Sequence, residues 1–383
     1  MAVTAVRTYV LQAPLEHPFA FSQPGWVTRR AAMVVELEDD AGRFGYGECL
    51  LNGLEPPEIA RATVEAALAD LVRGADPLDR AVLWERMYNL TRDFGMKGAV
   101  VAAVSAVDIA LWDLAGQMLG VSVARLLGGR FRDRVRAYAT GFYRRADTDR
   151  AALVEEARAH RAAGFTAMKV KIGFGPADDV ATLTAIREAV GPDVLLMADA
   201  NHAYNVATAR RLIRDLDPLD LLWLEEPIAP EDLDGYRELK ALGPRLWIAA
   251  GENEYTRHGF WPWVAARAVD VLQPDLTAAG GFTGLRDIVA LATAAGLLVN
   301  PHVWGTAIGL AASLQLLATL PPVPISRGAF EPLLEFDRSV HPFRQELVVQ
   351  PIRAEAGVVR IPDGPGLGIT VDRAALRRLA GAG

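Results

Sequence analysis

Hydrophobic and polar positions follow two different patterns along the chain. In the first part, alternating apolar runs at 2–11, at 31–37 and around Tyr46 predict β-strands. A loop containing Pro and Gly is expected between the first two, over residues 17–26. Apolar residues then recur at helical spacing and predict three helices, at Pro57–Arg73, Leu78–Leu90 and Ala99–Leu119. Because these elements do not repeat, residues 1–130 are expected to form an α+β domain.

From residue 131 the pattern becomes repetitive, since short apolar runs alternate with helical stretches such as Ala151–Ala163. Seven of these runs predict strands, at 135–140, 167–173, 194–201, 221–227, 247–252, 269–275 and 297–302. Repeated strand-then-helix units form a parallel sheet, and this many units close into a barrel. The sequence therefore predicts a modified (β/α)7β barrel of the TIM type over residues 131–335, with a less distinct eighth strand near Ser326–Glu331.

The last segment, residues 336–383, differs from the barrel units. It contains a strand-like run at 358–362, a turn-forming PDGPGLG sequence and a final helix. We expect this tail to pack back on the N-terminal domain. The fold class is then α/β, with a barrel and an α+β capping domain formed by both ends of the chain.

Polar residues recur where the predicted barrel strands end. They are Lys171, Asp199, Glu225, Glu252, Asp275, His302 and Glu335. Successive members are 23 to 33 residues apart, and one strand–loop–helix unit of such a barrel takes about 30 residues. The ends of the barrel strands meet at one face, where the active sites of this fold lie. The spacing predicts one pocket that can hold a metal ion and move protons.

Three of these residues are acids on successive predicted strands, and they suit a metal ion. Asp199, Glu225 and Glu252 would repel one another strongly unless a cation lay among them. Ligand sets made only of oxygen favour Mg²⁺ or Mn²⁺ over zinc. Glu226 is an alternative to Glu225, and strand alternation alone does not decide which of the two points inward.

Two lysines lie on one strand, in the sequence Lys169-Val170-Lys171. Residues i and i+2 of a strand point the same way, so both lysines face the mouth of the barrel or neither does. Two lysines lying close together near a cation would lower each other's pKa, and a neutral amine could then act as a base. Two solvated lysines at a strand end remain an alternative.

The next two predicted strands end in Asp275 and His302. A carboxylate that binds one imidazole nitrogen fixes the tautomer and raises the basicity of the other nitrogen, which gives an acid–base group. Glu335 could, if protonated, hydrogen-bond a developing oxyanion, or it could anchor the last strand. Glu331 is an alternative for that place.

Composition and charge narrow the class of protein. The 383 residues are 51% hydrophobic and 23% charged, with a net charge of −7 and no basic block. We therefore expect no nucleic-acid partner and no binding to an anionic membrane. The single cysteine, Cys49, fits a reducing compartment, and the start lacks a signal-peptide pattern. No uninterrupted apolar stretch approaches about 20 residues, so no membrane span is expected. These features predict a cytoplasmic protein.

Six short motifs in this order resemble the enolase superfamily, specifically its mandelate racemase subgroup. They are KVK at 169–171, DAN at 199–201, EEP at 225–227, GE at 251–252, QPD at 273–275 and PH at 301–302. The resemblance implies one Mg²⁺ per subunit, held by Asp199, Glu225 and Glu252. It implies catalytic roles for Lys171, Lys169, Asp275 and His302. It implies substrate contacts by Lys169, Asn201, His202 and Glu335. No second cofactor is implied, and symmetric homo-oligomers are common in this subgroup.

Longer stretches are similar to the galactarate cycloisomerases and acid-sugar dehydratases of this subgroup, among them VRAYATG, DVLQPDLTAAGGF and EFDRSVHPFRQE. The segment after Asp275 lacks the lysine that the muconate-lactonising subgroup would place there. The resemblance implies removal of the proton alpha to a carboxylate of an acid sugar, through a metal-stabilised enolate, followed by dehydration or cycloisomerisation. The cap loops that would set specificity, at 19–29, 49–54 and 92–97, are less clearly shared.

Two alternatives remain open at this point. Bases on both faces of a substrate would also permit 1,1-proton transfer, and thus a racemase or epimerase of a 2-hydroxy acid. The other alternative is a barrel that binds a small carboxylate without turnover. The side chains of the cap distinguish between the classes of substrate. A polyhydroxylated diacid needs polar and cationic groups, and the cap offers Arg29, Arg30, Arg92 and Lys97. An aryl substrate would instead need apolar groups such as Phe19, Phe21, Trp26 and Phe94.

Overall fold

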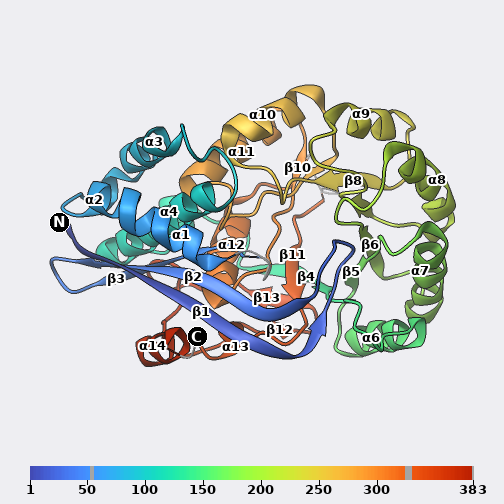
Figure 1. The fold of residues 1–383 in the computed structure, drawn as a ribbon, viewed down its shortest axis with the longest axis horizontal. Helices are drawn as coiled ribbons and strands as arrows, with labels where there is room; N and C mark the ends of the chain where they lie inside the picture. The colour runs from blue at the N-terminus through green and yellow to red at the C-terminus, as the bar shows by residue number, and fades with distance from the viewer. Residues whose placement is uncertain (52–55, 324–329, 382–383) are drawn as a thin grey trace.

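The computed structural model describes residues 1–51, 56–323 and 330–381. The N-terminal part is a three-stranded antiparallel sheet in the order β1-β2-β3, covered by helices (Figure 1). Its elements are β1 Val3–Phe19, β2 Val27–Asp39, β3 Phe44–Cys49, α1 Pro57–Thr63, a π-helix Val64–Leu68, α2 Ala69–Val72, a 3-10 turn Pro77–Asp79, α3 Arg80–Thr91, α4 Ala99–Leu119 and α5 Val123–Leu126. The predicted α+β character is confirmed.

The loop predicted over residues 17–26 is shorter than expected. Strand β1 continues to Phe19, which pairs with Val27 at the start of β2. The connecting segment is therefore residues 20–26, and it lies near the barrel. Of the cap loop expected at 49–54, residues 52–54 lie outside the described residues.

Helix α4 runs over Ala99–Leu119, as predicted from its apolar spacing, and ends at Gly120 in the left-handed region (φ 66°). By length and composition alone this helix could span a membrane, with a mean hydropathy of 1.7, although Asp108 and Asp113 interrupt its apolar sequence. Within the molecule, however, 89% of its apolar window is buried. It packs on β3 and on the barrel helix α11, Gly281–Ala294, so its apolar surface belongs to the core.

Eight parallel strands form the barrel sheet, in the spatial order β10-β9-β8-β7-β6-β5-β4-β11. They are β4 Arg134–Thr140, β5 Ala167–Lys171, β6 Leu195–Asp199, β7 Trp223–Glu225, β8 Trp247–Ala250, β9 Val271–Leu272, β10 Leu298–Val299 and β11 Leu334–Asp337. Among the described residues no backbone pairing joins β10 to β11. There the side chain of Asn300 accepts a hydrogen bond from the backbone N–H of Leu333 (2.7 Å).

Seven helices follow the first seven strands and lie on the outside of the sheet (Figure 1). They are α6 Arg150–Ala162, α7 Pro176–Val190, α8 Val206–Leu216, α9 Leu233–Ala241, α10 Thr256–Ala266, α11 Gly281–Ala294 and α12 Ala307–Thr319, with a 3-10 turn at Asp217–Leu219 after α8. Side-chain caps begin several of them; Asp149, for example, accepts from Ala152 N–H (2.8 Å) at the start of α6. The predicted (β/α)7β order is confirmed.

The last barrel strand is not where the sequence suggested. The strand is Leu334–Asp337, which pairs in parallel with β4, whereas residues 326–329 of the expected segment lie outside the described residues. The physical reason is that this strand is short and carries the polar side chain of Glu335 on its inner face, so its apolar pattern is weak.

The tail begins with α13 Pro342–Gln345 and continues with β12 Ala354–Glu355, β13 Val358–Arg360 and α14 Arg373–Ala380. Strand β13 pairs antiparallel with β4, and α14 lies beside β1 (Figure 1). Arg373 forms an ion pair with the buried Glu36 of β2 (3.0 Å). The tail thus returns to the N-terminal sheet, while the domain boundaries at 130 and 335 stay predictions.

Candidate active site

The strand register sets three of the predicted site residues side by side. Lys171 pairs with Asp199 across β5 and β6, and Asp199 pairs with Glu225 across β6 and β7. Two positions before Asp199 and Glu225, where side chains point the same way, lie Met197 and Trp223, which belong to one apolar cluster. The polar side chains therefore stand at the open end of a filled barrel.

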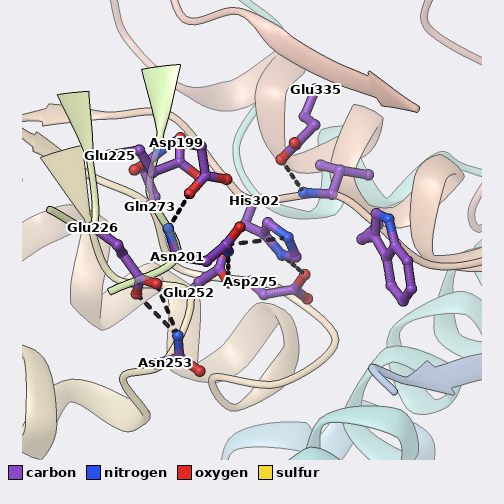
Figure 2. Close-up of polar contacts among 12 residues, drawn as sticks. Asp199, Asn201, Glu225, Glu226, Glu252, Asn253, Gln273, Asp275, His302 and Glu335 are labelled. Atoms are coloured by element: carbon purple, nitrogen blue, oxygen red, sulfur yellow. Dashed lines mark hydrogen bonds and ion pairs between the residues drawn. The ribbon is translucent and has the colours of Figure 1, made fainter. Parts of the chain in front are cut away.

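Asp199, Glu225 and Glu252 form a group that could hold a metal ion. One oxygen from each carboxylate lies within 4.8 Å of the other two, and Figure 2 shows all three in one region of the site. The donors are all oxygens, which suits Mg²⁺. Glu252 Oε2 is buried and accepts no hydrogen bond from the described residues. Both the donor set and this free oxygen fit a divalent cation.

Glu225 and Glu226 have different surroundings although both are buried. Glu225 ends β7 and accepts hydrogen bonds from Lys169 Nζ (2.5 Å), Gln273 Nε2 (2.7 Å) and Trp223 Nε1 (3.1 Å). Glu226 has a left-handed backbone (φ 41°), and its carboxylate accepts from Asn253 Nδ2 (3.0 Å) (Figure 2). The turn at Glu226 breaks the strand alternation, and Glu225 is the one that joins the acid group.

Both lysines are buried among the acids. Lys169 Nζ lies 2.5 Å from Glu225 Oε1 and 2.9 Å from Glu335 Oε1. Lys171 Nζ donates to Asp199 Oδ2 (2.5 Å) and Asn201 Oδ1 (2.9 Å). The pair of solvated lysines considered from the sequence is therefore absent from this strand.

In this arrangement the pKa values of both lysines are raised, and the lowering expected beside a cation stays a prediction. Burial lowers the pKa of Lys171 and Lys169 lowers it further, but Asp199 and Glu252 together raise it above its ordinary value. Burial also lowers the pKa of Lys169, yet Glu225 and Glu335 raise it well above the usual range. The reason is that each ammonium lies closer to carboxylates than to the other ammonium.

Asp275 and His302 meet as predicted, at an isolated parallel bridge beyond β9 and β10. His302 Nδ1 lies 2.7 Å from Asp275 Oδ2, and His302 Nε2 lies 3.4 Å from Glu252 Oε2. In Figure 2, His302 lies between these two carboxylates. Burial lowers the pKa of His302, but Glu252, Glu335 and Asp275 raise it, to about 10. The ring thus presents one nitrogen to the acid group and is oriented through the other.

Of the two acids considered for the last strand, Glu335 is the one at the site. It is buried on β11, pairs with Lys169 and accepts from the backbone N–H of Val303 (3.1 Å). Burial raises the pKa of Glu335, but Lys169, His302 and Lys171 together lower it below the ordinary value, so the expected protonated donor is not the form favoured here. Glu331 has a largely exposed side chain, paired with Arg132 (3.4 Å).

Residues from the cap and the barrel line one cleft at this end. They are Phe21, Gln23, Tyr143, Lys171, Asn201, Glu252, His302 and Trp304. Asn201 has a left-handed backbone (φ 41°) and reaches Lys171 and Glu252 (3.4 Å). His202 is not among the lining residues; its ring contacts the side chain of Gln23.

Several site residues had no predicted role. Gln273 stood in the quoted QPD motif and Trp304 in PHVWG, so a signal existed for both. Tyr143 and Gln23 lie in segments without regular spacing, and their place depends on contacts between the cap and the barrel that no local pattern encodes.

Two family models match most of the chain. Residues 4–128 match the N-terminal domain of the mandelate racemase / muconate lactonizing enzyme family. Residues 152–375 match the "enolase C-terminal domain-like" family. Together they cover the three-stranded sheet with its helices and the barrel except for its first strand, β4.

Full-length relatives support the same grouping. The chain is 45% identical over 377 residues to D-galactarolactone cycloisomerase of Agrobacterium fabrum, covering 98% of each protein. The solved structure of 3,6-anhydro-D-galactonate cycloisomerase from Zobellia galactanivorans is similar with a TM-score of 0.88 and 34% identity, over 99% of each chain. A structure of an L-talarate/galactarate dehydratase variant with magnesium and L-glucarate is similar with a TM-score of 0.85 and 28% identity, over 97% of this chain and 90% of that one.

Proposed function

Because the chain belongs to the mandelate racemase / muconate lactonizing enzyme family of enolase-like proteins, we propose that it is a Mg²⁺-dependent enzyme acting on an acid sugar. It is an enzyme of the lyase or isomerase type, as its named relatives are. The proposed reaction removes the proton alpha to a carboxylate and then dehydrates or cyclises the product. The observation that carries this proposal is that Lys171 and His302 line one cleft beside the three clustered acids.

Asp199, Glu225 and Glu252 would hold one Mg²⁺ per subunit. When bound, the ion would polarise a substrate carboxylate and so make the adjacent C–H more acidic. Gln273 and Trp223 each donate to Glu225 Oε2 and so fix its carboxylate. Such bonds to a ligand orient it and tune its affinity. Lys169 adds a buried positive charge beside the same acids, where it would stabilise negative charge that develops on the substrate.

Lys171 and His302 would exchange protons with the substrate. Lys171 comes from β5 and His302 follows β10, which lie far apart in the row of strands. A base on each side can take the alpha proton from either face of the carbon. Lys171 shares Asp199 with the proposed ion, so metal binding and the proton on Lys171 are linked. Asp275 holds Nδ1 of His302, which leaves Nε2 to give or take a proton.

In the dehydration, the C–H electron pair becomes a C=C bond and the bond to the β-oxygen breaks. The second group gives its proton to the departing oxygen, which leaves as water and yields an enol that converts to a 2-keto acid. When the β-oxygen is the ring oxygen of a lactone, it leaves as a carboxylate and the lactone opens. In the reverse sense, a carboxylate adds to the β-carbon of the C=C bond while the alpha carbon takes a proton, and a lactone closes. No oxidant or reductant is needed.

Transfer of a proton from one face to the other without elimination remains the second candidate, a racemase or epimerase of a 2-hydroxy acid. This candidate is supported by the position of the two bases, Lys171 and His302, on separate strands. The non-catalytic barrel is disfavoured, because the acid group, the lysine pair and the Asp275–His302 pair are all present in one site.

Proton NMR of the protein with Mg²⁺ against galactarate, glucarate and their lactones tests the proposal. New signals of a 2-keto acid or of a different lactone are expected for at least one compound. Inversion of the configuration at the alpha carbon without elimination or cyclisation would favour the epimerase. Silence across the panel would overturn the acid-sugar proposal.

The setting of the enzyme also remains a proposal. We propose a cytoplasmic homo-oligomer whose partner is a small carboxylate, with no nucleic acid and no membrane. Light scattering during gel filtration would measure the mass in solution, and a monomer would contradict the assembly.

A further inference from the structure

Half of the described residues that line the cleft carry no proposed chemistry. Lys171, Asn201, Glu252 and His302 lie at the metal end. The other four form what we call the aromatic wall, made of Phe21, Gln23, Tyr143 and Trp304. Phe21 and Gln23 come from the segment between β1 and β2, Tyr143 follows β4, and Trp304 lies two residues beyond His302. The wall therefore joins the cap to both sides of the barrel mouth.

Tyr143 is fixed in this wall from three directions. The residue after it, Arg144, forms two backbone hydrogen bonds with Ala20 of the cap segment (2.7 and 2.9 Å). The ring of Tyr143 stacks on Phe19, with 4.2 Å between ring centroids. Its hydroxyl accepts a hydrogen bond from Trp304 Nε1 (2.7 Å). A side chain held in this way is preorganised to bind a ligand.

Arg30 supports the wall from behind. Its guanidinium lies 4.4 Å from the ring centroid of Trp304 and 5.1 Å from that of Phe19. It also donates to Asp337 Oδ2 of β11 (3.0 Å) and to the hydroxyl of Ser339. Only 1% of Arg30 is exposed, and its guanidinium is paired with Asp337 inside the protein. Arg30 is thus a positioning residue and does not provide a cation to the cleft.

The hydroxyl of Tyr143 keeps a proton that it can donate. The bond from Trp304 uses an oxygen lone pair, and no described residue accepts the phenolic proton. Burial raises the pKa of Tyr143, and Asp337 raises it further, so the phenol is neutral. A buried donor without an acceptor is costly, and an oxygen of a bound ligand would satisfy it.

The wall also lacks charge. Its four described members are aromatic rings, a phenol and an amide, and the basic side chains of the lining, Lys171 and His302, stand at the metal end. Of the cap cations considered from the sequence, Arg30 is paired with Asp337 and Lys97 with Glu254 (2.9 Å). A second carboxylate on the substrate would meet no free cation among the described residues of the wall.

We propose that Tyr143 is a specificity-determining residue that donates a hydrogen bond to an uncharged oxygen at the end of the substrate remote from the metal. The aromatic wall then selects a singly charged acid sugar, a lactone with one free carboxylate, over the open dicarboxylate. This inference rests on the proposed acid-sugar function and adds the form of the substrate.

Steady-state kinetics of Tyr143→Phe on galactarolactone and on galactarate, with Mg²⁺, test the inference. One neutral hydrogen bond contributes about 0.5–1.5 kcal/mol, so kcat/KM on the lactone should fall about 3- to 10-fold, mainly through KM. The value on galactarate should change less. Tyr236→Phe is the matched control, because its buried hydroxyl donates to Ile228 O (2.9 Å) outside the cleft; its kinetics should match the unaltered protein.

The outcomes separate the two proposals. If the unaltered protein converts the lactone and Tyr143→Phe does so with the same KM, the role of Tyr143 is overturned while the function stands. If the unaltered protein prefers galactarate, the selection of the lactone is overturned. If it converts neither compound nor the glucarate pair, the function and this inference fail together.

Two further variants guard against misfolding. Should Tyr143→Phe not fold, Trp304→Phe removes the N–H that orients the Tyr143 hydroxyl, and a rise in KM confined to the lactone is again expected. Arg30→Lys keeps the charge but loses the flat guanidinium. Its effect on KM should be smaller in a Tyr143→Phe background than alone, since both act through the same hydroxyl. Additive effects would show that Arg30 does not act through Tyr143.

Discussion

At the residue scale, the site depends on buried charges that balance one another. Lys169 Nζ lies within 3.3 Å of an oxygen from each of Asp199, Glu225 and Glu335. With Glu252 the site holds four carboxylates against the ammonium groups of Lys169 and Lys171, and a divalent cation would offset the excess of negative charge. The electrostatics of these residues therefore favour a metal ion, as the resemblance does.

Removing one ligand oxygen should therefore weaken Mg²⁺ binding. Replacing groups that merely orient a ligand costs 10- to 100-fold in metal affinity, so Asp199→Asn, Glu225→Gln and Glu252→Gln should each cost about 100-fold or more. Calorimetric titration with MgCl₂ measures this.

Glu226→Gln is the control, because its carboxylate accepts hydrogen bonds from Asn253 and is not one of the three clustered acids. It should bind Mg²⁺ nearly as the unaltered protein does. Unchanged affinity in the three ligand variants, or a large loss only in Glu226→Gln, would show that the wrong acids were chosen.

The choice between these neighbouring acids shows what a sequence reveals about single residues. The EEP motif predicted an acid at this position. The alternation of side chains along a strand could not decide between Glu225 and Glu226, because the backbone of Glu226 leaves the strand with a positive φ of 41°. Likewise Lys169 and Lys171 were expected to lower each other's pKa beside a cation. Their partners Glu225 and Asp199 come from other strands, and the acids around the two lysines raise both pKa values.

At the element scale, the strands could be predicted because each is an apolar run followed by a polar residue at a regular interval. Seven strands and the helices between them lie where the pattern indicated. Of these, β9 and β10 lie inside their predicted segments but are shorter, since each pairs over only two residues. The last strand, β11, was missed because its buried Glu335 is matched by Lys169 of a strand that is distant in sequence.

Helix α4 is joined to the barrel helix α11 by a buried acid. Asp108 accepts from the backbone N–H (3.0 Å) and hydroxyl (2.5 Å) of Thr283. Burial raises the pKa of Asp108 from 3.8 to about 7. The folded protein therefore favours the protonated form, and the stabilisation is full below about pH 4 and is lost as the pH rises through about 7.

Asp108→Asn should remove this pH dependence, because an amide in the same place does not ionise. The stability of the unaltered protein relative to Asp108→Asn should fall between pH 4 and pH 7. Denaturant unfolding of both proteins across this range measures the difference. A constant difference, or one that rises with pH, would contradict the assignment.

At the scale of the whole molecule, the cap and the barrel are bound together by Glu48. This acid lies on β3, is 1% exposed and accepts from Thr306 N (2.7 Å), Thr306 Oγ1 (2.6 Å) and Gly309 N (2.7 Å) at the start of α12. Thr306 follows His302 closely in sequence. The contact therefore couples the cap sheet to the segment that carries the proposed acid–base group.

Glu48→Ala should lower the thermal midpoint by at least about 5 °C, since it leaves three donors at the helix start without their partner and such a group costs about 1–3 kcal/mol. Differential scanning calorimetry measures the midpoint. Asp70→Ala is a control in the cap, because Asp70 has an exposed side chain paired only with Arg73, and it should change little. Equal midpoints for both variants would show that Glu48 does not hold the two parts together.

Contacts between distant parts of the chain could not be predicted from the sequence. The barrel, the cap and the polar strand ends could be predicted, because each depends on local pattern. The aromatic wall could not, since Tyr143 contacts Phe19 and Trp304, which lie 124 and 161 residues away. Arg30 was considered as a cation for the substrate, but its partner Asp337 lies on the last strand and removes it from that role.

Lys171 and His302 are proposed to move protons at the alpha carbon of a carboxylate. Proton NMR in D₂O with Mg²⁺ and an acid-sugar lactone follows loss of the alpha-proton signal and formation of product at the same time. Lys171→Ala and His302→Asn should each lower product formation by about 10²- to 10⁴-fold, the usual contribution of an acid–base group. Lys240→Gln, which alters a lysine paired with Asp270, serves as control and should act as the unaltered protein does.

The two variants should also differ from each other. With the variant that lacks the abstracting base, the substrate should keep its alpha-proton signal. With the variant that lacks the second group, the substrate should exchange that proton for deuterium, and no product should form. Normal exchange and normal product formation in both Lys171→Ala and His302→Asn would contradict a role of these two residues in proton transfer.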